Sequence, residues 1–392
     1  MVATNGKASK SVSTEAKSFE IITHSGLDTS QVVGKAPRKR QESQNKIVNI
    51  NLDLDAGSAN CKFVINGEYS DTFPTIFKEV LGELPLGISG CFSIGSKNYA
   101  VGQVAYSLNG NLVEASRDNK IKKLDVWLIG ALTSHPDLLT DIAGFRKYKA
   151  KPARLKITLR LLSLSSSKKN DIAKILLSVK SFTCSGQVFE IEIANTDYLF
   201  PEGYGAALEA RKHIPEDIKT FDILDLGGGT ITFSTYKVGR LPKATEQTPG
   251  SGNGMKAIID SLSIALCRED RGGLQFKKEN IESALRNSKP IGDGKHSCLY
   301  RHGTTTLEIG DTVAYSLSEW VMQYPIVESL LNKVSQSLLN GRYVFATGGG
   351  FAISAIAEWL ERYVCDGIEN PKFFVLDNPQ SINLTGLQHL DK

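Results

Sequence analysis

Hydrophobic and polar residues alternate over residues 48–54 of this chain, and the alternation stops at Asp55. A period of two predicts a strand, followed here by a turn at residues 55–60 and a returning strand. The same order recurs in residues 221–239, where an apolar run stops at Asp225, passes three glycines and resumes as an alternating strand. The two halves of the chain therefore begin alike, which predicts a duplicated fold.

The rest of the pattern predicts a mixed α/β chain. Further strands are predicted at residues 153–164, 187–193 and 372–376, and a strand, a glycine run and a helix at residues 342–364. Helices are predicted at residues 125–134, 204–214, 255–267, 277–289 and 311–339, the last broken or kinked at Pro325. Polar and glycine-rich stretches predict a loop at residues 165–171 and a linker at residues 244–254.

The composition predicts a cytoplasmic globular protein of two lobes or domains. The chain has 392 residues, of which 41% are hydrophobic and 22% charged, as is ordinary for globular proteins. No run approaches the ~20 apolar residues of a membrane span, and residues 1–20 lack the apolar core of a secretory signal. The six cysteines occur singly, which predicts reduced thiols and argues against a zinc site.

The basic excess of the chain is confined to one short stretch. Residues 35–46 hold five basic residues and one acidic residue, which accounts for the formal net charge of +4 of the whole chain. The part that follows is electrically balanced, and a balanced body is a poor candidate for direct DNA binding. Residues 1–45 are rich in Ser, Thr, Lys, Gln and Gly, and this composition predicts a disordered basic and polar tail.

Glycines 227–229 are the first candidate for chemistry. Without side chains they expose backbone N–H groups, which suits a phosphate-binding concavity. An ordinary hairpin explains them equally well, because Gly-Gly is a common turn signal. Asp55 and Asp225 can likewise be interpreted as turn formers. Glu202 can be interpreted as a helix-capping carboxylate and Lys62 as a solvated strand residue.

Five motifs occur together in the order found in the actin/Hsp70/sugar-kinase superfamily, and they span most of residues 47–390. The matching segments are residues 55–62 (DAGSANCK, first phosphate motif), Pro201 and Glu202 (first connecting segment), residues 225–230 (DLGGGT, second phosphate motif), residues 347–350 (TGGG, adenosine motif) and residues 378–387 (final connecting helix). Within the superfamily, DAGSANCK is most similar to the ParM and Alp group of bacterial actins. A plasmid-derived member repurposed as a cytoskeletal protein fits the same resemblance.

This resemblance implies an α/β, actin-like fold, which is a duplicated ribonuclease H-like ATPase fold of two lobes with a nucleotide cleft between them. Residues 46–215 are expected to form lobe I, with the first phosphate motif and an inserted subdomain. Residues 216–392 are expected to form lobe II, whose final helix returns to lobe I. The chain departs from the group in its tail, residues 1–45, and at Gly229, where Thr or another residue is common.

The resemblance also implies that the cleft binds ATP or GTP with Mg²⁺. Asp55 and Asp225 are expected to hold the metal, since Mg²⁺ is typically held by one or two carboxylates and by substrate phosphates. Glu202 and Asp225 are expected to be catalytic, with Glu202 orienting the attacking water. The expected nucleotide-binding residues are Asp55, Gly57, Ser58, Ala59, Asn60, Lys62, Gly227, Gly228, Gly229, Thr230, Lys278, Glu282, Gly348, Gly349 and Gly350.

The function that the resemblance implies is that of a filament-forming ATPase whose first partner is a further copy of itself. A second partner would be an adaptor protein bound to centromere-like DNA, as in plasmid segregation. In a cytoskeletal role in cell shape it would instead be an anchor at the membrane, for which the tail is a candidate contact. The alternative is a small-molecule kinase of the sugar-kinase type from the same superfamily, which would not form filaments.

Overall fold

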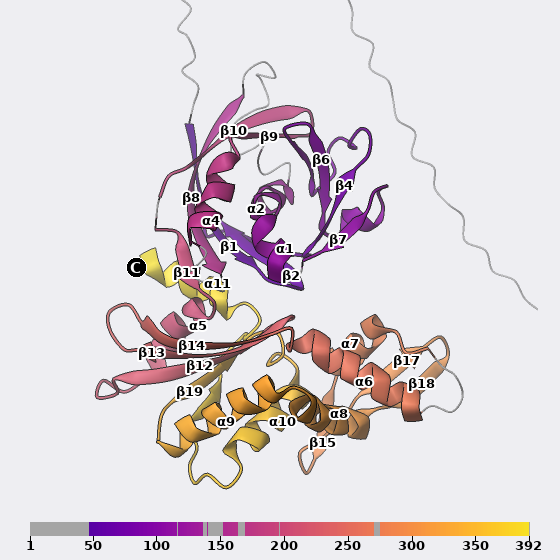
Figure 1. Cartoon of the computed structure of the whole chain (residues 1–392), viewed down its shortest axis with the longest axis vertical. Coiled ribbons are helices and arrows are strands. Elements are labelled where there is room, and N and C mark those ends of the chain that lie inside the picture. Colours follow the sequence, from indigo (N-terminus) through magenta and orange to yellow (C-terminus); the bar gives the residue numbers. More distant parts are fainter. Residues whose placement is uncertain are drawn as a thin grey trace, which may run out of the picture. The chain divides into compact units, whose positions relative to one another are not determined.

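The computed structural model describes residues 47–115, 117–135, 139, 152–163, 169–195, 197–269 and 275–391. All of them belong to one compact unit, which contains two main β-sheets (Figure 1). The predicted tail, residues 1–45, and the basic stretch that ends at residue 46 lie outside the described residues. The predicted boundary between two lobes at residue 215 stays a prediction.

The first sheet begins with the predicted strand–turn–strand unit, whose two strands pair antiparallel. Eleven strands of the described chain belong to this sheet, with β1 and β8 paired in parallel. In spatial order they are β3 (Tyr69–Pro74), β2 (Asn60–Ile65), β1 (Ile47–Ala56), β8 (Ala153–Ser163), β10 (Gln187–Ile193), β9 (Ser181–Cys184), β5 (Cys91–Ile94), β6 (Lys97–Val101), β4 (Ile76–Val80) and β7 (Leu112–Glu114), with β11 (Leu199–Pro201) paired to β8.

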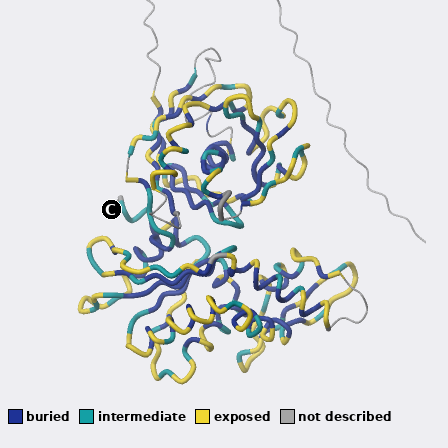
Figure 2. Tube along the Cα trace, in the orientation of Figure 1, coloured by how far each residue is buried: buried dark blue, intermediate teal, exposed yellow. Residues whose placement is uncertain are grey.

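Helix α2 (Leu124–Thr133) lies inside the curve of the first sheet (Figures 1 and 2). All of its residues except Asp125 are buried, as expected of a helix that is apolar on every side. The rings of Trp127 and Phe77 meet edge to face with their centroids 5.5 Å apart. Helix and sheet together therefore form the first hydrophobic core.

Further helical segments near this sheet are η1 (Gly102–Tyr106), α1 (Arg117–Lys122) and α4 (Lys169–Ser178). The loop predicted at residues 165–171 is wrong at its end, because residues 169–171 form the first turn of α4. Asp171 lies in that turn, where a carboxylate interacts favourably with the helix dipole. Polar residues at the start of a helix therefore resemble a loop in the sequence pattern.

The second sheet contains the second strand–turn–strand unit, as predicted. In spatial order its strands are β14 (Lys243–Ser251), β13 (Thr230–Lys237), β12 (Thr220–Leu226), β19 (Val344–Thr347) and β20 (Phe373–Val375). The linker predicted at residues 244–254 is wrong, because residues 244–251 pair antiparallel with β13. An edge strand can be polar and can hold a proline such as Pro249, so its sequence resembles a linker.

Helices cover both faces of the second sheet. Along β12, Phe221 and Ile223 pack on the side of α5 (Tyr204–Ala210) and α11 (Ile382–Leu387), whereas Leu224 and Leu226 pack on the opposite side. The opposite side holds α6 (Met255–Glu269), α7 (Lys278–Arg286), α8 (Gly310–Gln323), α9 (Pro325–Leu339) and α10 (Ser354–Cys365). The predicted break at Pro325 is confirmed, since α9 begins there. Two hairpins complete this half, β15 (Lys289–Gly292) with β16 (Lys295–Ser297) and β17 (Leu299–His302) with β18 (Thr305–Glu308).

The short helices α5 and α11 lie between the two sheets and join their cores. Each is extended by a 3₁₀ turn, η4 (Arg211–His213) and η5 (Gln388–Asp391). They cross at glycines: a Cβ atom on Gly205 would overlap the backbone carbonyl of Asn383, and one on Gly386 would overlap that of Gly205. The two helices therefore touch backbone to backbone, and no larger residue fits at the crossing.

Replacing Gly205 by alanine is expected to destabilise the protein, because the new Cβ would overlap the Asn383 carbonyl. Overpacking of this kind costs about 1–3 kcal/mol, occasionally more. Gly239→Ala is the matched control, since its Cβ would meet only the Leu241 carbonyl, at 3.3 Å. Chemical denaturation of both variants measures the difference, and equal free energies of unfolding would contradict the crossing.

Candidate functional site

The turn after β1 and the turn after β12 face each other. A Cβ atom added to Gly228 would lie 2.6 Å from the Cβ of Ala59, and one added to Gly229 would lie 2.9 Å from the Cβ of Ser58. Cβ atoms do not approach this closely, so any side chain on these glycines would force the two turns apart. Gly228 and Gly229 therefore permit contact between turns from opposite halves of the chain.

A cavity of about 150 Å³ lies at this contact. The predicted site residues that line it are Asp55, Gly57, Ser58, Ala59, Asn60, Lys62, Glu202, Asp225, Gly227, Gly228, Gly229, Thr230, Glu282, Gly348 and Gly349. The structure adds Leu162, Met255, Lys256, Ile259, Arg286, Gln380 and Asn383. Cavities of about 740 Å³ and 640 Å³ lie elsewhere in the second half. Neither is lined by the two turns, so we take the smaller cavity as the candidate site.

Two predicted nucleotide contacts, Lys278 and Gly350, are not among the lining residues. The Lys278 side chain is 62% exposed, and its Nζ lies 2.6 Å from a carboxylate oxygen of Asp260. The Gly350 N–H donates to the Leu226 carbonyl at 2.9 Å, and a Cβ on Gly350 would overlap the Leu226 side chain. Gly350 thus supports the second turn from behind, and a direct contact of either residue with a nucleotide stays a prediction.

Asp55 on β1 lies opposite Lys62 on β2, and Lys62 Nζ is 3.3 Å from Asp55 Oδ2. Burial opposes the charged form of Lys62. The neighbouring carboxylates, with Asp55 the strongest, outweigh burial and raise the pKa of Lys62. Lys62 is therefore held as a cation beside the cavity, where it can act as a point charge toward a phosphate.

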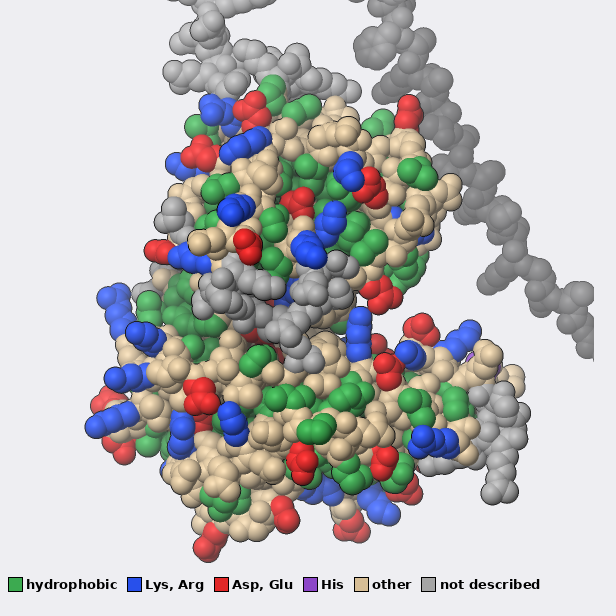
Figure 3. Space-filling model, viewed as in Figure 1, with side chains coloured by type: hydrophobic (Ala, Val, Ile, Leu, Met, Phe, Trp, Pro, Cys, Tyr) green, Lys and Arg blue, Asp and Glu red, His purple; other side chains and the backbone are tan. Residues whose placement is uncertain are grey.

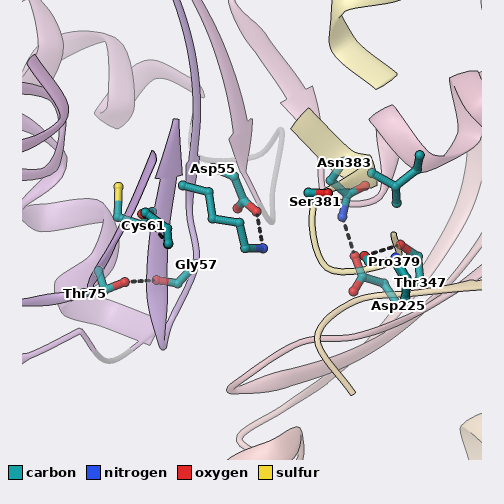
Figure 4. A network of polar contacts seen from close by, with 12 residues as sticks. Asp55, Gly57, Cys61, Thr75, Asp225, Thr347, Pro379, Ser381 and Asn383 are labelled. Atoms are coloured by element: carbon teal, nitrogen blue, oxygen red, sulfur yellow. Dashed lines mark hydrogen bonds and ion pairs between the residues drawn. The ribbon is translucent and has the colours of Figure 1, made fainter. Parts of the chain in front are cut away.

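Asp225, at the end of β12, is 8% exposed. Burial raises its pKa, and a hydrogen bond from Asn383 opposes that rise. Asn383 Nδ2 donates to Asp225 Oδ2 at 2.9 Å (Figure 4). The predicted adenosine motif, residues 347–350, is tied to the segment before α11, because Thr347 Oγ1 and the Gly348 N–H both donate to the Pro379 carbonyl, at 3.0 and 2.9 Å. Segments far apart in the sequence thus converge on one carboxylate.

Glu202 lies just before α5 and is half-buried. Its Oε2 atom is fully buried and has no hydrogen-bond partner among the described residues. Burial raises the pKa of Glu202 to about 7, while Lys120 lowers it and the Asp225 carboxylate raises it to a smaller extent. A buried carboxylate oxygen without a partner is rare, and it indicates a place where a water or ligand atom completes the hydrogen bonding.

Lys120, on α1, is a charged residue near the site that the sequence does not predict. It is 5% exposed, and its charge acts on both Glu202 and Asp225. A buried lysine requires nearby negative charge, so it belongs electrostatically to this site. The segment around it also contains Lys122 and Lys123, and nothing in the sequence separates Lys120 from them.

Lys256 and Arg286, which also line the cavity, are likewise absent from the prediction. Lys256 Nζ lies 3.4 Å from a carboxylate oxygen of Glu114 on β7. Arg286 lies 2.8 Å from the Glu282 carboxylate, one helical turn away. The i, i+4 spacing of Glu282 and Arg286 could have predicted Arg286 from the sequence, because residues at this spacing lie side by side on a helix.

The side chains that line the cavity include possible metal ligands. No group of three or more His, Cys, Asp or Glu side chains suited to a metal ion occurs within the described part of the chain. Mg²⁺ does not require such a group, because it keeps several waters and takes one or two carboxylates plus phosphate oxygens. Asp55 and Asp225, one from each half, both line the cavity. The residues therefore fit a hydrated Mg²⁺ held together with a polyphosphate.

Solved structures with a similar fold identify the architecture. One is a ParM filament from Clostridium botulinum (TM-score 0.58, 16% identity, 88% of this chain and 99% of that chain). Another is the actin-like protein Alp7A (TM-score 0.58, 15% identity, 88% and 96%), and a third is Bacillus thuringiensis ParM with ATP (TM-score 0.52, 14% identity, 89% and 100%). The fold is actin-like. This confirms the predicted α/β, two-lobed fold class.

The actin-like fold is what these comparisons establish, because the identities are low. No protein-family model matches the sequence, and no curated protein matches it. None of the helices in the described residues is both long and apolar enough to cross a membrane.

The raised pKa of Glu202 predicts that stability depends on pH. In the folded protein the carboxyl keeps its proton up to about pH 7, whereas in the unfolded chain it loses the proton near the ordinary value of 4.5. The folded state binds more protons over this interval. The free energy of unfolding is therefore expected to fall as pH rises from about 5 to 8, by at most about 3 kcal/mol.

Glu202→Gln has no proton to lose, so it is expected to match the wild type at pH 5 and to be the more stable protein at pH 8. Denaturant unfolding at both pH values measures this. Glu216→Gln, at an exposed position, serves as the control. The same pH dependence in the wild type and in Glu202→Gln would contradict the burial of this carboxyl.

Proposed function

We propose that this protein is a nucleotide-dependent, filament-forming ATPase. The observation that carries the proposal is the meeting of two turns, one from each half, at a cavity into which each half also brings an aspartate. Backbone N–H groups of both turns can clamp the phosphates of one nucleotide from opposite sides. The ligand would then bridge the two halves of the chain. Its binding could therefore change how the two halves are positioned relative to each other.

The phosphates are proposed to lie between residues 57–60 and residues 227–230, with Lys62 as a further positive charge. Asp55 and Asp225 would hold Mg²⁺ through its waters and the phosphates. When bound, Mg²⁺ neutralises charge on the phosphate oxygens. We propose ATP as the nucleotide, with GTP as the other candidate. Glu282 and Arg286 would lie toward the base or ribose, since they line the cavity from α7.

Glu202 is proposed to act on the water that attacks the terminal phosphate. Its buried Oε2 has no partner among the described residues, so it is free to accept a hydrogen bond from that water. Its pKa of about 7 lies near neutral pH, where a carboxylate can both orient a water and take up its proton. Positioning of this kind supplies most of the catalysis in phosphoryl transfer.

Self-assembly is proposed by analogy with the solved ParM structures, which include a filament and a complex with ATP. The filament would act in the cytoplasm, either in plasmid DNA segregation or as a cytoskeletal element that controls cell shape. On the face shown in Figure 3, acidic and basic side chains are interspersed over both halves. Such a surface favours contact with DNA through an adaptor protein at a centromere-like site, and a cell-shape role would need an anchor instead.

Right-angle light scattering with Mg²⁺ and ATP, against ADP, followed by electron microscopy, tests the proposal. The wild type is expected to show an ATP-dependent rise and filaments. Glu202→Ala is expected to bind nucleotide normally but to hydrolyse it about 10²–10⁴-fold more slowly, because the attacking water loses its base. Its polymers should therefore persist longer than those of the wild type. Phosphate release, measured on the same samples, gives the hydrolysis rate.

Glu216→Ala, at an exposed position before β12, is the control for this substitution. A flat scattering trace from wild-type protein that binds ATP would contradict the filament proposal and favour a small-molecule kinase. Unaltered hydrolysis in Glu202→Ala would remove Glu202 from the mechanism.

A further inference from the structure

Asn383, on α11, makes two buried hydrogen bonds in different directions. Its Nδ2 donates to Asp225 Oδ2 at 2.9 Å, and its Oδ1 accepts from the Ala206 N–H of α5 at 3.1 Å. The residue is 8% exposed and lines the candidate site beside Asp225 (Figure 4). A buried amide that uses its donor and its acceptor in this way is fixed in orientation, and it fixes the carboxylate that it contacts.

The backbone that carries Asn383 is also tightly held. Its carbonyl lies against Gly205 so closely that a Cβ there would overlap it. At the other end of α11, Arg160 on β8 donates to the Leu387 carbonyl at 3.0 Å. Closely packed backbones pass on a displacement rather than absorb it. A shift of Asp225 would therefore reach α5 and the first sheet through α11.

The other groups that act on Asp225 are charged and come from different elements. They are Lys62 and Asp55 from the first hairpin, Lys120 from α1, and Glu202 from the segment before α5. Asn383 differs from them because it is neutral. It can therefore set the direction of the Asp225 carboxylate without changing the net charge of the site.

We propose that Asn383 is a positioning residue that couples metal binding at Asp225 to the crossing of α5 and α11, an inference that rests on the proposed function. Holding Asp225 in one orientation prepares it for a hydrated Mg²⁺ with its nucleotide. The Ala206 hydrogen bond links that orientation to the helix that joins the two sheets. Binding of Mg²⁺ and ATP then stabilises the crossing, and, reciprocally, a change at the crossing alters the affinity for the metal.

Two substitutions separate the two hydrogen bonds. Asn383→Asp keeps an oxygen for the Ala206 N–H but replaces the donor to Asp225 by a carboxylate oxygen. Asn383→Leu removes both bonds without adding charge. Thr385→Ala is the matched control, because Thr385 is exposed on the same helix and its hydroxyl bonds only to carbonyls of its own helical turn.

The affinity for ATP is measured with Mg²⁺ and with EDTA, and the ratio of the two gives the metal enhancement. Both Asn383→Asp and Asn383→Leu are expected to reduce this ratio by about 10–100-fold, the range found for residues that orient metal ligands. Hydrogen exchange at the Ala206 amide reports the coupling. In the wild type, Mg²⁺ with ATP is expected to slow this exchange more than ATP in EDTA does. In Asn383→Asp, the exchange rate with ATP should be the same with Mg²⁺ and with EDTA.

A purely structural role for Asn383 would weaken ATP binding equally with and without Mg²⁺. A ratio equal to that of Thr385→Ala would therefore overturn the inference, and so would an Ala206 exchange rate that does not respond to Mg²⁺ in the wild type. Wild-type protein that binds ATP under neither condition would overturn the proposed function itself, and with it this inference.

Discussion

The contact between two polypeptide turns is the constraint on which the arrangement of the site depends. Gly228 and Gly229 lie so close to the first turn that no side chain fits between the two halves there. This contact requires the two sheets to be held at a fixed separation. The crossing of α5 and α11, which lie between the sheets, sets that separation. That crossing is itself limited by Gly205 and Gly386. Two close contacts made by glycines, one at the site and one behind it, thus fix how the two lobes are positioned relative to each other.

The same contact between the two turns brings several carboxylates close together at the site. Asp55, Asp225 and Glu202 converge on one cavity, and burial raises the pKa of Asp225 and of Glu202. Bringing carboxylates together away from water costs free energy, which Lys62 and Lys120 offset in part. A metal ion and the backbone N–H groups around a polyphosphate would complete the compensation. The repulsion that remains between these carboxylates is therefore a reason for the site to favour a ligand that brings a metal cation with it.

The parts of the fold that the sequence predicts are those with local signals. Period-two alternation identifies both strand–turn–strand units, and a glycine run marks the second. Residues of the five short motifs make up most of the cavity lining. The sequence does not predict β14, because an edge strand can be polar. It does not predict the buried position of Lys120 either, because burial depends on which residues pack over the side chain. Asn383 lies 158 residues from Asp225, so their hydrogen bond exists only after the two sheets and α11 are assembled.

The most direct test of a ligand held between both turns is hydrogen exchange across the two turns, residues 57–60 and 227–230, during titration with ATP and Mg²⁺. We predict that the amides of both turns become protected together, with the same half-saturating ATP concentration, because one nucleotide contacts both. Protection of one turn alone, or of neither at concentrations where ATP binds, would contradict a phosphate site shared by the two halves of the chain.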